Sequence, residues 1–204
     1  MANNLIAFRP TLPTPSLTSR VADWTHFGTI HYQGQRPRHY LTRGALPEDV
    51  REEATTQLAT LSSALDPMGS FAGLPADEAK LGIVNTLMMG LAVGKASEAA
   101  IDARMDLFEM ALDDVPAWAV AEAVRRWVKR ACPPSIDKNP NYTWPPAPPT
   151  LRAMAYDVIA PYVCTMDMLR KLLSAETKDA AFDERPAAVS AISVLAPALW
   201  LKRM

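Results

Sequence analysis

The sequence predicts an all-α fold, in which a single helical domain of five or six helices follows a Pro-rich basic N-terminal arm. Hydrophobic residues make up 49% of the 204 residues and charged residues 21%, which is enough apolar material for a packed core. Prolines outnumber glycines by 18 to 8, which favours separated helices over a glycine-turn-rich sandwich or barrel. From residue 46 onward, apolar side chains recur every three or four residues, as on one face of a helix.

The predicted arm covers residues 1–45, and the predicted helical domain covers residues 46–204. The arm contains five arginines and one aspartate, a net charge of +4, which leaves −5 for the rest of a chain whose net charge is −1. Its prolines alternate with serine and threonine, so we expect a partly extended segment without a core of its own. Within the arm, the aromatic and β-branched stretch 24–32 suits a short strand or a docking segment.

Helix-start signals and apolar spacing place the helices of the domain. We expect helices over about 47–66, 75–94, 97–113, 116–131 and 151–175, and a last amphipathic segment over about 186–201. Pro47 in a first turn and N-caps at Ser97 and Asp114 mark three of the starts. Seven prolines between residues 133 and 149 exclude a helix there, and Pro161 is expected to kink or split the helix that follows. The predicted core contains Leu87, Leu91, Phe108, Leu112, Trp118, Trp127, Leu151 and Val158.

The sequence lacks the motifs of common enzyme classes. Neither GxGxxG nor GxxxxGK[ST] occurs, and the run from Gly90 to Lys95 is one residue short of a phosphate-binding loop. All three histidines lie in the arm, without further metal ligands nearby at ligand spacing. We therefore expect a non-enzymatic protein without cofactor or metal. Two cysteines without CxxC spacing, no signal-peptide pattern and no apolar stretch of membrane-spanning length predict a cytoplasmic protein with reduced thiols.

Two charged surfaces are candidate binding sites. The helix over 97–113 places five acidic side chains at three- and four-residue steps on one stripe, which is able to attract a basic protein partner or is simply a solvated helix face. The basic residues are candidates for nucleic-acid binding, or for capping a helix dipole and docking the arm. The candidate partner-binding residues are Glu98, Asp102, Asp106, Glu109 and Asp113. The candidate nucleic-acid-binding residues are Arg36, Arg38, Arg43, Arg125, Arg126, Lys129 and Arg130.

The order of the motifs over about residues 79–170 carries a family resemblance. An acidic amphipathic helix ends in Leu-Asp-Asp-Val-Pro116, the next helix contains Ala-Trp-Ala-Val-Ala-Glu-Ala-Val-Arg-Arg-Trp127, and Tyr142-Thr-Trp-Pro-Pro-Ala-Pro-Pro-Thr-Leu151-Arg leads into a further helix. This order resembles the small helical replication proteins of phages and prophages, the helicase loader and loader-inhibitor class. In that class the last motif carries an acidic residue where this sequence has Thr150. The resemblance implies a protein without ATPase motifs that binds a replicative hexameric DNA helicase.

Three functions follow from these observations as hypotheses. The first is a non-enzymatic phage-type DNA replication accessory protein that loads or inhibits a replicative helicase, with DNA as a further contact of the arm. The second is a DNA-binding regulator that uses the basic residues, with an affinity that falls steeply with salt. The third is a phage protein that inhibits a host protein, or a virion component, and binds through the acidic stripe.

Overall fold

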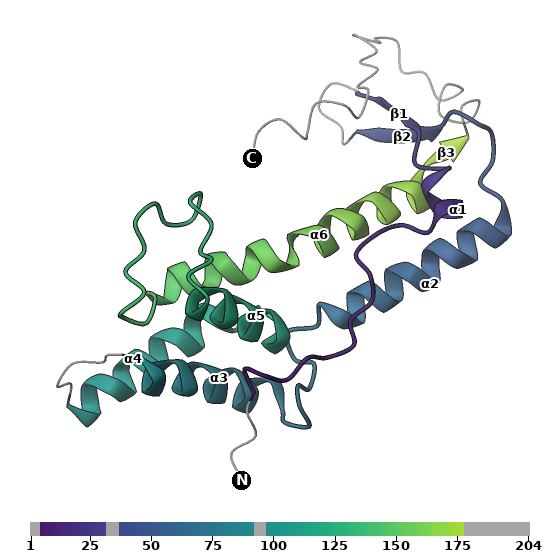
Figure 1. Ribbon diagram of the computed structural model, residues 1–204. Helices are drawn as coiled ribbons and strands as arrows, with labels where there is room; N and C mark the ends of the chain where they lie inside the picture. The colour runs from purple at the N-terminus through teal and green to yellow at the C-terminus, as the bar shows by residue number, and fades with distance from the viewer. Residues whose placement is uncertain (1–4, 32–36, 92–96, 178–204) are drawn as a thin grey trace. The chain divides into compact units, whose positions relative to one another are not determined.

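The computed structural model describes residues 5–31, 37–91 and 97–177, apart from the side chain of Glu98. In chain order (Figure 1) the elements are α1 (Ser19–Ala22), β1 (Phe27–Ile30), β2 (Arg38–Leu41), α2 (Glu48–Ala64), α3 (Ala76–Gly90), α4 (Glu98–Leu112), α5 (Ala117–Val128), α6 (Pro148–Ser174) and β3 (Glu176–Thr177). Helices hold 55% of the described residues and strands 7%, so the predicted mostly helical class is confirmed, with a small sheet in addition. The predicted segment over 186–201 lies outside the described residues.

Contacts within the chain gather into two compact units. The first unit contains the described residues of Met1–Thr14 and Thr60–Val163, and the second contains those of Pro15–Ala59 and Cys164–Met204. Helices α2 and α6 each contribute residues to both units. This grouping differs from the predicted division at residue 46, because each unit combines a part of the predicted arm with a part of the predicted helical domain.

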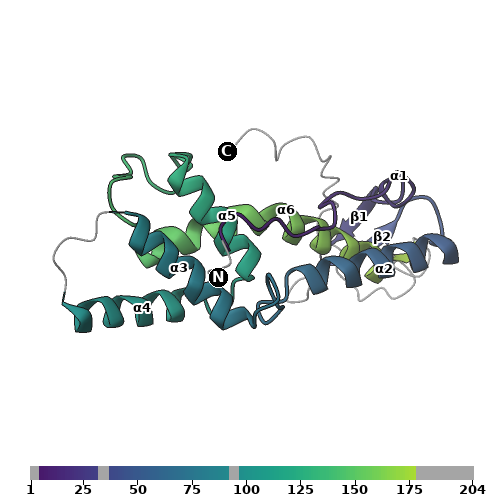
Figure 2. The same cartoon turned by 60° about the horizontal axis from the view of Figure 1, so that its bottom comes forward.

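The core of the first unit is built from α3, α4 and α5, and α3 packs against both of the others (Figures 1 and 2). Seven of the eight predicted core residues are buried, and the eighth, Leu91, is half-buried just after the end of α3. Nine of the twelve residues of α5 are buried. Glu122 and Arg126 are half-buried and Val128 is exposed, so α5 lies largely in the interior of its unit.

Helix α5 begins at Ala117 with Pro116 as its N-cap, so the predicted cap at Asp114 is wrong by two residues. Pro116 has extended backbone angles that stop α4 from continuing into α5. The carboxylate of Asp114 instead accepts hydrogen bonds from Arg152 and Tyr156 of α6, at 2.7 and 2.6 Å. The turn between α4 and α5 is thereby tied to the first half of α6.

The N-terminal segment of the chain packs against α3. The buried side chain of Leu5 lies beside Gly82 of α3, where a Cβ would stand only 2.6 Å from a Leu5 methyl carbon. The ring of Phe8 meets that of Phe71 edge to face, with centroids 5.0 Å apart. This part of the predicted arm therefore contributes side chains to the core of the first unit.

The Pro-rich connection between α5 and α6 folds against Trp127. The indole N–H of Trp127 donates to the carbonyl of Trp144 at 3.1 Å, and its ring centroid lies 4.9 Å from that of Tyr142. Helix α6 begins at Pro148, so the prediction that the prolines exclude a helix between residues 133 and 149 is wrong for the last two of these residues. Prolines fit the first helical turn because the N–H groups there have no partner within the helix. Pro161 lies inside α6, which continues through it as one helix.

The second unit contains a three-stranded sheet in the order β1-β2-β3. β1 and β2 pair antiparallel, with Gly28 opposite Tyr40, and β2 pairs in parallel with β3 through Tyr40 and Glu176. The strand expected within 24–32 is confirmed as β1, whereas β2 and β3 were not predicted. The two-residue strand β3 is too short to leave a period-two pattern in the sequence.

Candidate protein-binding site between α3 and α4

Helix α4 presents three different faces along its length. Ser97 caps its N-terminus as predicted, because the Ser97 hydroxyl accepts the N–H of Ala100 at 3.3 Å. One face is buried through Phe108 and Leu112 against α3. A second face carries the acidic stripe, and a third exposes the large apolar side chains of Leu107 and Met110. The two exposed faces make α4 a helix that is only partly covered by its own unit.

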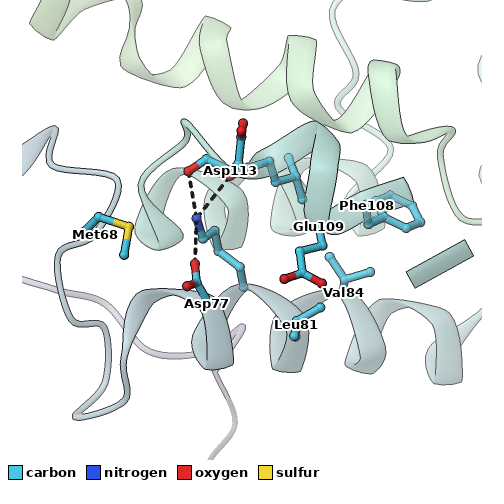
Figure 3. A pocket seen from close by; sticks show the side chains of 9 residues that line it. Met68, Asp77, Leu81, Val84, Phe108, Glu109 and Asp113 are labelled. Carbon is cyan, nitrogen blue, oxygen red and sulfur yellow. Dashed lines mark hydrogen bonds and ion pairs between the residues drawn. The ribbon is translucent and has the colours of Figure 1, made fainter. Parts of the chain in front are cut away.

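A pocket of about 230 Å³ lies between α3 and α4 (Figure 3). Its apolar lining includes the buried side chains of Val84 and Phe108 and the half-buried side chain of Leu81. Met68, in the connection between α2 and α3, also lines the pocket and is 65% exposed, so an apolar side chain borders the opening. The complete lining comprises Met68, Asp77, Lys80, Leu81, Val84, Phe108, Glu109, Leu112 and Asp113.

Lys80 is the single basic residue of the pocket lining, and its ammonium group binds to groups of the protein itself. Its side chain is 6% exposed, and its ammonium group donates to the carbonyls of Leu112 and Asp113 at 3.2 and 3.1 Å. The same nitrogen pairs with the carboxylate of Asp77 at 3.4 Å (Figure 3). These carbonyls end α4, where a cation complements the helix dipole. With three carboxylates and one lysine, the pocket lining has a net charge of −2.

The structure brings part of the predicted acidic stripe to this pocket. Glu109 and Asp113 line it, and Figure 3 shows Glu109 directed toward the α3 side chains Leu81 and Val84. Asp102 and Asp106 are exposed on α4 outside the lining. The side chain of the fifth candidate, Glu98, lies outside the described part of the structure. The stripe therefore continues from the pocket along the exposed surface of α4.

The seven basic candidates do not form one described surface. Arg125 is 8% exposed, and its guanidinium donates to the carbonyls of Ile6 and Phe8 at 2.7 and 3.2 Å and pairs with Glu122 at 2.6 Å. Burial makes Arg125 a structural residue that fixes the N-terminal segment, and leaves it unable to reach a phosphate backbone.

Ion pairs also engage other basic candidates. Arg126 pairs with Asp157 at 2.7 Å, and Arg38 in β2 lies 3.9 Å from Glu176 in β3. Three candidates, Arg43, Lys129 and Arg130, are exposed. Arg36 lies outside the described residues. Arg43 belongs to the second unit and the other two to the first, so these three are not shown to share a surface.

One histidine of the predicted arm, His39, has structural contacts. His39 in β2 lies 3.1 Å from the Thr29 hydroxyl through Nδ1, and its ring meets that of Phe27 edge to face. Burial, and next the positive charge of Lys171, lower the pKa of His39 below 6.5. Within residues 5–31, 37–91 and 97–177, no group of three or more His, Cys, Asp and Glu side chains is placed to hold a metal ion.

Sequence reasoning missed the α3 half of the pocket. Asp77, Lys80, Leu81 and Val84 follow a three- and four-residue spacing that puts them on one face of α3. That spacing is visible in the sequence, but it does not say which helix covers the face.

The described helices include none that is both long and apolar enough to cross a membrane.

Comparison with protein-family models, with curated proteins and with solved structures returns no match.

Proposed function

We propose that this chain is a non-enzymatic, phage-type DNA replication accessory protein that binds a replicative helicase as a loader or an inhibitor. The observation that carries the proposal is the α3–α4 pocket, which is apolar inside, acidic at its rim and continuous with an exposed acidic stripe. Such a surface recognises a protein by burying apolar side chains and by matching charge. The motif order over residues 79–170 supports a helicase as the protein partner.

A helicase loader or inhibitor needs no catalytic residue. It shifts the equilibrium between helicase conformations by binding one of them more tightly, and the difference in affinity sets the size of the shift. A tenfold preference for one conformation corresponds to about 1.4 kcal/mol, which a few side-chain contacts at a small interface are able to supply. The pocket and the acidic stripe together offer contacts of this kind.

A protein partner explains the charged residues better than DNA does. The guanidinium groups of Arg38, Arg125 and Arg126 are occupied by carboxylates or carbonyls within the protein. The acidic stripe, in contrast, has exposed carboxylates at Asp102, Asp106 and Glu109. Exposed carboxylates repel a phosphate backbone and attract basic protein surfaces. We place this interaction in the cytoplasm, where free thiols such as those of Cys132 and Cys164 stay reduced.

Binding to the purified replicative helicase of the host tests the proposal. The full chain, treated with nuclease to remove bridging DNA, is expected to bind at micromolar concentration in a pull-down and in biolayer interferometry. Replacing Asp102 and Asp106 with asparagine should lower the association rate, because steering by these charges is lost. The matched control replaces Glu52 and Glu78, two exposed carboxylates on α2 and α3, with glutamine and should leave the association rate unchanged. Absence of binding to any replicative helicase at about 10 μM would contradict the proposal.

An unwinding assay separates loading from inhibition. A loader should increase helicase activity on DNA coated with single-strand-binding protein, where the helicase alone assembles slowly. An inhibitor should lower unwinding on a bare forked substrate, where no loading step is needed. A third outcome, capture of a different host protein or of phage particles with no effect on the helicase, would favour a host-directed inhibitor or a virion component instead.

A further inference from the structure

We infer that the α3–α4 pocket receives an amphipathic helix of the partner protein, with one apolar anchor side chain in the pocket and Lys or Arg side chains along the acidic stripe. This inference deepens the proposed function, because it states the chemistry of the helicase segment that would be bound. It rests on the volume of the pocket, its charge and its position between two helices.

The volume of the pocket favours a side chain over a small molecule. Ligand sites for drug-sized molecules and cofactors occupy about 300 to 1,000 Å³. The α3–α4 pocket has about 230 Å³ and is lined by Leu81, Val84, Phe108 and Leu112, so it suits one or two aliphatic or aromatic side chains. Met68 at the opening is unbranched and exposed, and such a side chain adapts to anchors of different shape. The expected anchor is therefore Leu, Ile, Met or Phe.

The charge of the pocket selects a cationic segment. Lys80 has its ammonium group engaged by Asp77 and by two carbonyls, so it has little capacity left to bind an anion. Glu109 and Asp113 are exposed, and no ion pair is described for either carboxylate. An acidic peptide or a phosphate group would be repelled by the net charge of −2, whereas Lys and Arg would be attracted.

The spacing of the carboxylates matches a helix. Glu109 and Asp113 are four residues apart on α4, which corresponds to about 6 Å along the helix axis, and Asp106 and Asp102 continue the row. Lys or Arg side chains at three- and four-residue spacing on a second helix repeat at the same distance. A helix that lies along α4 is thus able to pair several charges while its apolar face meets the pocket, which is the helix-in-groove mode of recognition.

A synthetic peptide tests this inference independently of the helicase. The probe is a fluorescein-labelled peptide of about 18 residues, long enough to become helical on binding, in which Leu side chains form one stripe flanked by Lys on an Ala background. Two control peptides replace Lys with Glu or Leu with Ser. Fluorescence anisotropy with the full chain measures the affinity, and ¹⁵N-edited NMR spectra locate the binding site. We expect only the Leu- and Lys-containing peptide to bind and to shift the amide signals of Leu81, Phe108 and Glu109.

Two matched pairs of variants separate the pocket from general attraction by the acidic stripe. Glu109→Lys at the rim should weaken peptide binding at least about threefold more than Asp102→Lys, although both reverse one exposed charge of α4. Leu81→Ala in the lining should weaken peptide binding about fivefold. Leu107→Ala, which changes an exposed α4 residue outside the pocket, should leave peptide binding unchanged. If Leu81→Ala lowers the melting temperature, Met68→Ser repeats the test at an exposed position.

Several results would overturn the inference. These are equal effects of Glu109→Lys and Asp102→Lys, equal binding of the Lys and Glu peptides, or no shift of pocket signals at about 1 mM peptide. Failure of the proposed function looks different, because the peptide would still bind at the pocket while no helicase is bound. Conversely, helicase binding that Glu109→Lys and Met68→Ser leave unchanged would uphold the proposed function and refute this inference.

Discussion

At the scale of single residues, burial decides what a charged side chain does. Arg125 and Lys129 lie about one helical turn apart in the same basic cluster, yet Arg125 is only 8% exposed and Lys129 is an exposed residue. The guanidinium of Arg125 satisfies two carbonyls of the N-terminal segment and the carboxylate of Glu122. A buried cation with this set of partners is costly to remove, because the two carbonyls lose a charged donor and Glu122 loses one of its cationic partners.

Replacement of Arg125 is therefore expected to destabilise the protein. Arg125→Ala should lower the free energy of unfolding by about 3 kcal/mol, since the carbonyls of Ile6 and Phe8 lose a charged donor. Lys129→Ala is the matched control on the exposed surface and should change it by less than about 0.5 kcal/mol. Urea unfolding followed by circular dichroism measures both. Equal stability of the two variants would show that Arg125 does not hold the N-terminal segment.

Glu122 makes the same contact sensitive to acid. Burial by itself raises the pKa of Glu122, but the hydrogen bond and charge of Arg125, together with Arg9, outweigh it and hold the pKa below its ordinary value of 4.5. A carboxylate whose pKa is lowered in the folded state stabilises the protein at pH values above the ordinary pKa of that carboxylate. This contribution is lost as the pH falls through the folded-state pKa.

The stability of the wild-type protein should consequently fall more steeply below about pH 4.5 than that of Glu122→Gln. The control is Glu78→Gln, which removes an exposed carboxylate of α3 and should keep the wild-type slope. Unfolding free energies measured by urea titration between about pH 3 and pH 6 test the difference. Parallel pH profiles for the wild-type protein and Glu122→Gln would contradict the role of this carboxylate.

At the scale of elements, the end of α4 is fixed by a side chain of α3. Lys80 reaches from α3 to the carbonyls of Leu112 and Asp113, which have no partner within α4. The contact caps the last turn of α4, which Pro116 prevents from continuing into α5, and it holds the backbone of Asp113 beside the pocket. Helix α3 also packs against α4, and Val84 and Phe108 are buried on the two helices beside the pocket.

Lys80→Met should keep the apolar part of this side chain but lose its hydrogen bonds. We expect the free energy of unfolding to fall by about 2 kcal/mol, because two carbonyls at the end of α4 lose a charged donor. Asp77→Asn is the matched control, because it leaves both hydrogen bonds in place and removes only an ion pair whose carboxylate is 59% exposed. This variant should lower the free energy of unfolding by less than about 0.5 kcal/mol. Thermal and urea unfolding measure the two effects, and similar losses for both variants would refute this account.

At the scale of the whole molecule, the first residues of the chain belong to a folded unit. Leu5 is buried, Phe8 packs on Phe71, and the carbonyls of Ile6 and Phe8 bind Arg125. A deletion of residues 1–13 should therefore lower the melting temperature by about 5 °C or more, as expected for a loss of about 2 kcal/mol in a chain of this size. An unchanged melting temperature would show that these residues add nothing to the core of the first unit. Differential scanning calorimetry is the suitable measurement, because it also reveals whether the two units unfold separately.

The sequence by itself determined the helical class, the positions of most helices and seven of the eight predicted core residues. These follow from local causes, namely apolar periodicity, capping by Ser97 and the backbone limits of proline. It also identified the acidic stripe of α4, because a helix with known bounds places residues at three- and four-residue steps on one face. Local spacing thus predicted one wall of the candidate site.

Only the tertiary structure decided which of these residues act together. It placed Lys80 at the end of α4, turned Glu109 and Asp113 into the rim of an apolar pocket, and buried Arg125 beneath the N-terminal segment. It also paired β2 with β3, more than 130 residues apart in the sequence. Contacts between distant segments depend on how apolar faces cover one another, and burial sets whether a charge meets solvent or a partner. Neither property is contained in the local pattern of one segment.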